Sequence, residues 1–458
     1  MERTDGRSTL RASAQHILDN HPMGRQRWLM LIACFLIIAL DGADVQSASF
    51  IYPEFVRLWG VEKPFISAIV VGGLIAMVIG ASIAGPLADR YGRRSVVGWG
   101  VALVSTGTFL GAFAWDANIF LVIRAFTCLG LGAIMPITVA LISEFAPTQK
   151  RARVVTTVFA GYTAGAAISG YLAAVLIPML GWRWYLVAIG GLSAVMLPVF
   201  LKLVPESIGW LATQRDGERR VREIVQRVLP GADIATLKGT GGERTEAKVG
   251  GIKLITSKRY LPIMLGIATC YFIGLAVIYL FQTYFPLVIT QSGLQLSQAG
   301  ILVAAFSVGG VLGALLIGSA MDTFGRFKVL AVAWLIAIPA IWAVAFSTLD
   351  YQTLIVLSFI WGILLQGVNS GLNALAATLF PADARATGVS FMHALGRFGA
   401  ILSGLVGGVA ISLGWSIGKI FFILGCPLIV GVAAIIFLSV VSGRKDDVVI
   451  EDPAFLKA

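Results

Sequence analysis

Long apolar runs alternate with short polar segments along almost the whole chain. The runs are continuously apolar, without the strict alternation of apolar and polar positions that is typical of membrane-barrel strands, so they predict helices. Each run has at least 20 residues, enough for a helix to cross about 30 Å of hydrocarbon. We count twelve such runs, at 28–55, 64–88, 95–115, 118–143, 154–179, 184–204, 261–289, 299–320, 328–347, 352–377, 388–413 and 418–442.

One long polar segment separates the first six runs from the last six. We therefore expect an N-terminal six-helix half at 28–204, a central loop at 205–260 and a C-terminal six-helix half at 261–442. An N-tail at 1–27 and a C-tail at 443–458 flank the two halves. In the central loop, the stretch RRVREIVQRVL places its apolar residues on one helical face, and we interpret it as a surface helix in a solvated tether.

The composition places the chain among multi-pass membrane proteins. Hydrophobic residues make up 57% and charged residues only 13%, whereas soluble globular proteins have about 25% charged residues. The net charge of +11 would suggest nucleic acid if the basic residues shared one soluble face, but they lie between the runs, so we expect no nucleic-acid partner. The four cysteines lie in separate runs without metal-ligand spacing, and no nucleophile or metalloenzyme motif occurs, so we expect neither a metal site nor an enzyme.

The distribution of basic residues predicts the orientation in the membrane. With the N-terminus inside and the central loop left out, 17 lysines and arginines lie on the inner side and 4 on the outer side. Basic residues concentrate on the cytoplasmic side of membrane proteins. We therefore expect both termini to be cytoplasmic.

The chain repeats itself. The segment GPLADRYGRR at 85–94 returns as GSAMDTFGRF at 318–327, an offset of 233 residues. The matching pairs are Gly85 and Gly318, Asp89 and Asp322, Gly92 and Gly325, and Arg93 and Arg326. Parallel six-helix repeats joined by a cytoplasmic loop build one large transporter fold, with its substrate site near mid-membrane.

Small residues recur at four-residue spacing in several runs, for example at Gly161 and Gly165 in the fifth. Such stripes let helix backbones approach closely. They indicate either static packing or contacts where the two halves move, and the spacing does not separate these alternatives.

Ionisable residues deep in the runs are few, and they are candidates for the functional site. They are Asp41 and Asp44 in the first run, Arg124 in the fourth, and His393 and Arg397 in the eleventh. A charged side chain in lipid costs at least about 2.5 kcal/mol, so such residues usually face protein or a water-filled pathway. An acid pair beside a movable arginine has the properties of a proton carrier. The alternative is a structural ion pair between one aspartate and Arg124.

The second half contains the candidate substrate site. Arg397 has no repeat counterpart, and its paired donors suit a carboxylate, although they also suit the carbonyls of neighbouring helices. His393, one turn away, belongs either to the proton path or to the polar core. Uncharged polar and aromatic residues that suit a ring bearing hydroxyls are Gln366, Asn369 and Asn373 in the tenth run and Tyr279, Gln282 and Tyr284 in the seventh.

The repeated loop segment resembles the loop signature of the major facilitator superfamily. Within that superfamily the chain is most similar to the aromatic acid:proton symporters, through DGAD at 41–44, MPITVALISEFAPT at 135–148 and GRFGAILSG at 396–404. The resemblance implies an all-α fold of twelve transmembrane helices in two pseudo-symmetric halves. It also implies import of small aromatic carboxylates with protons by alternating access, with no cofactor besides the proton. The protein is then expected to be a monomer in the lipid bilayer of a bacterial cytoplasmic (inner) membrane. Another organic acid, efflux by antiport and a nutrient sensor are the alternatives.

The resemblance further implies a gate at the cytoplasmic ends of the halves. Asp89 and Arg93 would hold these ends together, with Arg151 or Arg153 as partner. The full set of gating candidates is Gly85, Asp89, Arg90, Gly92, Arg93, Arg94, Arg151, Asp322, Gly325 and Arg326.

Overall fold

The structure is a computed structural model, and it describes residues 13–147, 151–212, 214, 216–230, 255–258, 260–291, 293–346, 350–380 and 382–451. Helices account for nearly all of these residues, and no strand occurs among them. In the described residues, eleven helical segments are long and apolar enough to cross a membrane. The remaining predicted run, the third at 95–115, forms the 19-residue helix α4, which begins with two arginines. The predicted all-α membrane fold is confirmed.

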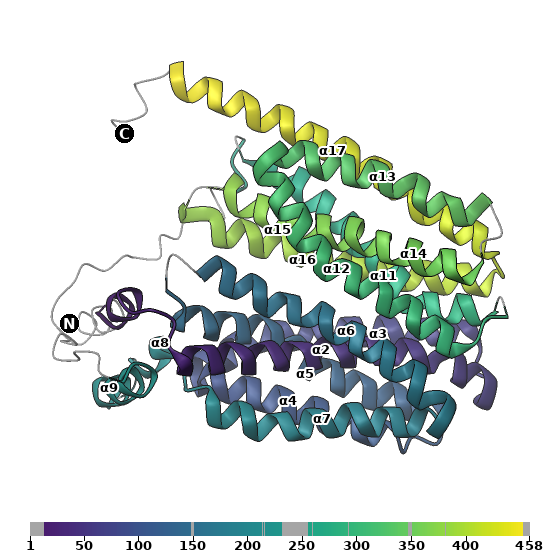
Figure 1. Cartoon of the computed structure of the whole chain (residues 1–458), viewed down its shortest axis with the longest axis horizontal. Coiled ribbons are helices and arrows are strands. Elements are labelled where there is room, and N and C mark those ends of the chain that lie inside the picture. The colour runs from purple at the N-terminus through teal and green to yellow at the C-terminus, as the bar shows by residue number, and fades with distance from the viewer. Residues whose placement is uncertain are drawn as a thin grey trace. The chain divides into compact units, whose positions relative to one another are not determined.

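The first compact unit contains the N-terminal half, apart from the first residues of α3. Its helices are α2 (Arg25–Trp59), α3 (Lys63–Tyr91), α4 (Arg93–Gly111), α5 (Ala117–Phe145), α6 (Arg151–Leu180), α7 (Trp182–Leu203), α8 (Ile208–Leu211) and α9 (Gly217–Val228). The helix α2 packs against α5, α6 and α7, and α4 packs between α5 and α7. The first helix of the half thus lies among its neighbours (Figure 1).

The second compact unit contains the C-terminal half. Its helices are α11 (Leu261–Gln291), α12 (Leu296–Phe324), α13 (Arg326–Phe346), α14 (Tyr351–Trp361), η2 (Gly362–Gln366), α15 (Gly367–Leu379), α16 (Ala382–Ser412) and α17 (Ile417–Glu451). The helix α11 packs against α12, α15, α16 and α17, so it lies among its neighbours as α2 does in the first unit (Figure 1).

The tenth predicted run differs from a single continuous helix. A five-residue π-helical turn, η2, separates α14 from α15. Such turns interrupt α-helices most often at functional sites. The polar residues Asn369 and Asn373 follow directly after this turn.

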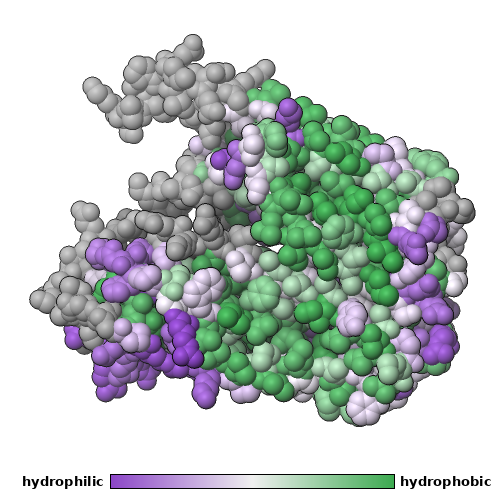
Figure 2. Space-filling view, viewed as in Figure 1, coloured by the Kyte–Doolittle hydropathy of each residue, from purple (hydrophilic) through white to green (hydrophobic). Residues whose placement is uncertain are grey.

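Apolar side chains cover the outer surface of the helices. On α3, Ile75, Ile79 and Ile83 are each about half exposed and lie four residues apart, so they form a stripe along one face. On the face shown in Figure 2, hydrophobic residues spread over the middle of the helices and hydrophilic residues gather at their ends. A surface of this kind suits a lipid environment, because apolar patches this extensive are rare on soluble proteins.

Glycines bring α2 and α6 into backbone contact. A Cβ atom at Gly165 would overlap the carbonyl oxygen of Ala39, and one at Gly161 would lie 2.6 Å from the carbonyl oxygen of Phe35. Gly42, next to the acid pair, approaches the carbonyl of Tyr162 in the same way. These contacts lie inside the first unit, so at these positions the small residues serve static packing.

The repeated glycines have the same backbone conformation. Gly92 ends the α3–α4 turn with φ of 95°, and Gly325 ends the α12–α13 turn with φ of 94°. Side chains strongly disfavour this region, so only glycine fits without strain. The sequence repeat therefore reflects a repeated turn.

The described part of the central loop packs against the first unit, unlike a solvated tether. The helix α9 confirms the predicted surface helix, but Val221, Val225 and Val228 are buried in the core of the first unit. A short helix at 13–19 in the N-tail contributes Leu18 to the same core. The buried guanidinium of Arg27 donates to the carbonyl oxygen of Leu18 at 2.9 Å and so fixes this helix.

Candidate functional site

A buried ion pair joins α2 to α5. Asp44 Oδ1 accepts a hydrogen bond from Arg124 Nη1 at 2.5 Å. The other terminal nitrogen of Arg124 donates to the backbone oxygens of Asp44 at 3.0 Å and Val45 at 3.4 Å. Asp44 is fully buried and Arg124 is only 8% exposed, so the pair is shielded from solvent. The ion pair between one aspartate and Arg124, which the sequence offered as an alternative, is present, and the aspartate is Asp44.

A hydroxyl from a third helix completes the surroundings of Asp44. Thr108 of α4 donates to Asp44 Oδ2, so each carboxylate oxygen has its own donor. The next carbonyl back along α2, that of Ala43, accepts from Ser169 of α6 at 2.8 Å, and Ser169 also bonds to the hydroxyl of Tyr185 at 2.6 Å. Sequence reasoning missed Thr108, because hydroxyl residues are common in membrane helices.

The second acid, Asp41, is 2% exposed and lies one turn before Asp44 on α2. The charges of Asp41, Asp44 and Arg124 all act on the thiol of Cys128, so these residues share one region of the unit. Two acids and one arginine within this region have a net charge of −1, 0 or +1 when zero, one or two protons are bound. A group of side chains that changes its charge by binding protons in this way has what a proton carrier needs.

The C-terminal half contains a second polar cluster. His393 and Arg397 lie one turn apart on α16, within range of each other's charge, as their spacing predicted. The ring of Tyr271 on α11 meets His393 edge-on, with ring centroids 4.8 Å apart. Tyr271 is also within electrostatic range of Arg397. Sequence reasoning missed Tyr271, because aromatic residues occur in every apolar run.

The residues of the predicted polar stripe on the tenth run contact two different neighbouring helices, α11 and α12. Asn373 Nδ2 lies 3.5 Å from the hydroxyl of Tyr271, and it donates to the backbone oxygen of Asn369 at 3.0 Å. The side chain of Gln366 instead packs against Gly310 of α12. Asn369 and Asn373 therefore belong to the cluster around Tyr271, and Gln366 lies against a different helix.

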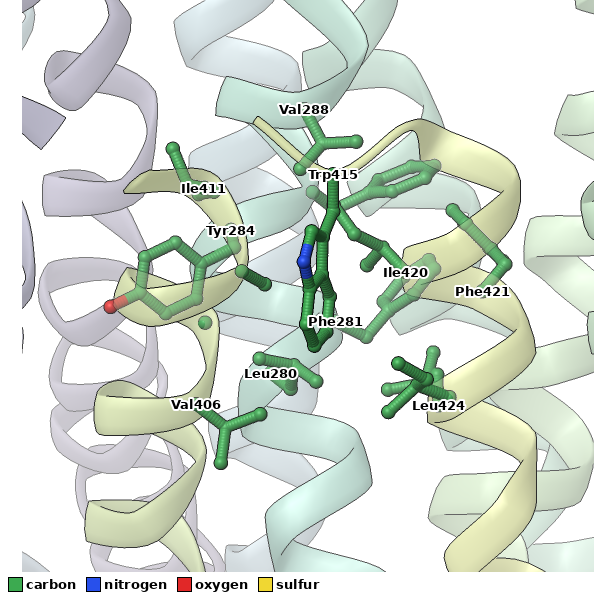
Figure 3. A pocket seen from close by; sticks show the side chains of 14 residues that line it. Leu280, Phe281, Tyr284, Val288, Val406, Ile411, Trp415, Ile420, Phe421 and Leu424 are labelled. Carbon is green, nitrogen blue, oxygen red and sulfur yellow. The ribbon is translucent and has the colours of Figure 1, made fainter. Parts of the chain in front are cut away.

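The three candidates further along α11 are placed differently from one another. Tyr284 borders an apolar cavity of about 30 Å³, together with Phe281 and Trp415 (Figure 3). Its hydroxyl donates to the carbonyl oxygen of Gly404 at 2.6 Å, so it ties α11 to α16. A role for Tyr284 in substrate binding stays a prediction. Tyr279 is partly buried and Gln282 is buried.

Charged residues also gather at the α3–α4 turn. Arg93 Nη1 pairs with Glu144 Oε1 of α5 at 2.5 Å, and Glu144 Oε2 accepts from Ser207 at 2.7 Å. Glu206 accepts from the backbone nitrogen of Arg94 at 2.9 Å. The partner of Arg93 in the structure is therefore Glu144. Sequence reasoning missed both glutamates, although each follows a run directly, in SEF and PES.

The other gating candidates lie mostly at the surface. Asp89 and Arg90 on α3 are exposed, as are Asp322, Gly325 and Arg326 at the equivalent turn of the second half. Gly85 is partly buried, and Arg94 donates to the carbonyl oxygen of Leu201. The side chains of Arg151 and Arg153 lie outside the described residues. The gating role of these residues stays a prediction.

Comparisons with known proteins agree with this architecture. Residues 34–296 and 267–454 match the Major Facilitator Superfamily. The 4-hydroxybenzoate transporter PcaK of Pseudomonas aeruginosa is 34% identical over 434 residues, 94% of this chain and 97% of the relative. A gallate transporter of Pseudomonas putida is 34% identical over 419 residues, 92% of this chain and 93% of the relative.

Solved structures show the same fold. The crystal structure of a D-xylose-proton symporter superposes with a TM-score of 0.67 at 17% identity, covering 90% of this chain and 97% of the other. The family match extends over most of the chain, and the two relatives align with it along nearly their whole lengths. This chain is a membrane transporter that belongs to the Major Facilitator Superfamily, among its aromatic acid transporters.

Proposed function

We propose that this transporter imports small aromatic carboxylates together with protons. The observation that carries the coupling is the buried ion pair of Asp44 and Arg124. The observation that carries the substrate class is the partly buried Arg397 beside the rings of His393 and Tyr271, supported by relatives that transport 4-hydroxybenzoate and gallate.

The ion pair supplies a switch with two states. While Asp44 is charged, its two oxygens accept from Arg124 and Thr108 and hold α2, α4 and α5 together. A proton on Asp44 removes the charge that Arg124 compensates, and a buried unpaired guanidinium is costly. Protonation therefore favours a rearrangement of these helices, and such a rearrangement is what couples a proton to a transport cycle.

In the second cluster, Arg397 provides a permanent positive charge that can bind the substrate carboxylate. The guanidinium of Arg397 keeps its charge at any physiological pH and offers paired donors to a carboxylate. The neighbouring aromatic edges of Tyr271 and His393 provide an apolar surface against which a ring packs. A sugar would need many more hydrogen-bonding groups than this cluster offers.

The test is uptake of 4-hydroxybenzoate into proteoliposomes under an imposed pH gradient, acid outside. The wild-type protein should concentrate the substrate, and Asp44→Asn should abolish concentration while retaining exchange of labelled for unlabelled substrate. Thr127→Val is the matched control, because in the described part of the chain the Thr127 hydroxyl donates to the carbonyl oxygen of Ile123, within its own helix, at 2.9 Å.

Three other outcomes of this uptake experiment would contradict the proposal. Uphill uptake by Asp44→Asn at the wild-type level refutes the coupling role of this residue. Movement of substrate toward the acid side identifies an efflux antiporter. Binding without any flux identifies a sensor.

We also propose that both termini are cytoplasmic, on the basis of the 17 to 4 excess of basic residues. Single cysteines in place of the exposed Trp115, between α4 and α5, and the exposed Arg220, on α9, test this. An impermeant maleimide added to intact cells should label only the cysteine at position 115. Labelling only at position 220 would reverse the orientation.

A further inference from the structure

The cluster around Tyr271 contains an acceptor that the protein itself does not use. The side chain of Asn369 hydrogen-bonds to Tyr271, but its buried oxygen has no partner of its own among the described residues. A buried acceptor without a donor is costly. Such an atom in a native structure calls for an explanation, and a donor from a ligand or a water molecule is one.

The residues around this oxygen are held firmly. Asn373 bonds to the Asn369 backbone at 3.0 Å and reaches the Tyr271 hydroxyl at 3.5 Å. The Tyr271 ring fits against Gly396 of α16 so closely that a Cβ atom there would overlap it. A Cβ atom at Gly274 of α11 would lie 3.3 Å from Asn369 Oδ1, so this glycine lets α11 approach the amide closely. Small residues on two helices thus shape the space around Asn369 and Tyr271.

The position of these groups relative to Arg397 suggests what they bind. Tyr271 contacts His393, which lies four residues before Arg397 on the same helix. Tyr271 also lies within electrostatic range of Arg397, and it hydrogen-bonds to Asn369. Arg397 and the Tyr271–Asn369 pair therefore suit the two ends of one aromatic ring, with the carboxylate on Arg397 and a para substituent toward Tyr271 and Asn369.

We propose that Asn369 and Tyr271 form a subsite that selects a para-hydroxylated ring over an unsubstituted one. The substrate hydroxyl donates to Asn369 Oδ1 and lies beside the hydroxyl of Tyr271. This inference rests on the proposed function, because it requires an aromatic carboxylate on Arg397. It assigns substrate selection, rather than anchoring or coupling, to two named residues.

The Asn369 oxygen should disfavour benzoate more than an apolar pocket would disfavour 4-hydroxybenzoate. Benzoate would bury the Asn369 oxygen without a partner, whereas 4-hydroxybenzoate supplies the donor. Sites built to hydrogen-bond a substrate hydroxyl reject the analogue that lacks it more strongly than apolar pockets reject an added hydroxyl. Leucine at position 369 removes the unsatisfied acceptor at similar size, so it should penalise 4-hydroxybenzoate without harming benzoate.

The test compares the dissociation constants of benzoate and 4-hydroxybenzoate, measured by calorimetry on the purified full-length protein. The wild-type protein should prefer 4-hydroxybenzoate by about tenfold, the value of one hydrogen bond. Asn369→Leu should reduce this ratio to about one, with benzoate affinity unchanged or higher. Tyr271→Phe should reduce the ratio several-fold while benzoate affinity stays constant.

Ser358→Ala is the matched control, because this buried hydroxyl on α14 also lacks a partner among the described residues but lies before the π-turn. It should keep the wild-type ratio. An unchanged ratio in both Asn369→Leu and Tyr271→Phe overturns the subsite. Equal losses for both ligands assign these residues a structural role and also overturn it. Failure of the wild-type protein to bind either ligand refutes the proposed function instead.

Discussion

One hydroxyl group holds the second oxygen of Asp44 in place. Replacing Thr108 with valine keeps the shape but leaves a buried carboxylate oxygen without a donor. We expect the free energy of unfolding to fall by about 1–3 kcal/mol. Denaturant titration of the purified protein in detergent measures this, and Thr108→Ser should restore most of the loss. Equal stability of the valine and serine variants would show that the hydroxyl contributes nothing.

Arg397 offers a second prediction for a single residue. Lysine keeps the positive charge but loses the paired donors that match a carboxylate. Arg397→Lys should weaken benzoate binding by about tenfold, the loss of one good hydrogen bond, and leave benzamide binding nearly unchanged. Calorimetry with both ligands checks it. If Arg397→Lys and Arg397→Gln both bind benzoate as the wild type does, the carboxylate binds elsewhere and Arg124 becomes the next candidate.

At the level of single residues, the charged residues of the site could be predicted from the sequence, but the uncharged residues that bond to them could not. Asp44 and Arg124 are evident because ionisable groups are rare in apolar runs, and their approximate depths predict a contact. Thr108 and Tyr271 are not evident, because hydroxyls and rings occur throughout such runs at little cost. Their roles depend on which helix faces come together, and this appears only in the folded chain.

Among the helices, the α2–α6 contact is the most sensitive to added volume. Gly165→Ala would place a methyl group where the backbone oxygen of Ala39 lies, so the helices must separate near the acid pair. We expect a loss of stability of about 3 kcal/mol or more, above the usual range for overpacking, because the obstacle is backbone. Gly191→Ala on α7 is the control, since nothing lies within 4 Å of the added carbon. Size-exclusion profiles and unfolding curves of the two variants should differ clearly.

The presence of the helices could be predicted from the sequence, but the irregular turn within one of them could not. The apolar runs predicted every spanning helix, because hydrocarbon permits almost no other structure for an isolated segment. The π-turn at 362–366 has the same apolar composition as an α-helical turn, so no pattern marks it. The burial of α9 was missed for a related reason: an amphipathic pattern shows that one face is apolar but not what covers it.

For the whole molecule, the internal repeat was the strongest predictor of the fold. Matching residues at an offset of 233 require two similar halves, and the shared positive φ of Gly92 and Gly325 gives this match a physical basis. The candidate site was less predictable, because its parts come from helices far apart in sequence. Only the pairing of charges could be anticipated from depth along each run.

The electrical balance of transport gives the last prediction. Moving a monovalent anion into a cell whose interior is negative costs about 2.3 kcal/mol per 100 mV of membrane potential. One accompanying proton makes the step electroneutral, and two make the membrane potential a driving force. Because two carboxylates, Asp41 and Asp44, are buried in the first half, we expect two protons for each substrate.

A potassium diffusion potential of about 100 mV, inside negative and without a pH gradient, should then drive about 50-fold accumulation in proteoliposomes. Asp41→Asn removes one exchangeable proton, so its uptake should respond to the pH gradient but no longer to the potential. There are two controls: liposomes without protein, and liposomes with the wild-type protein in which the membrane potential has been collapsed. Wild-type uptake that follows the pH gradient yet ignores the potential would mean a single proton, and the two acids would then share one coupling role.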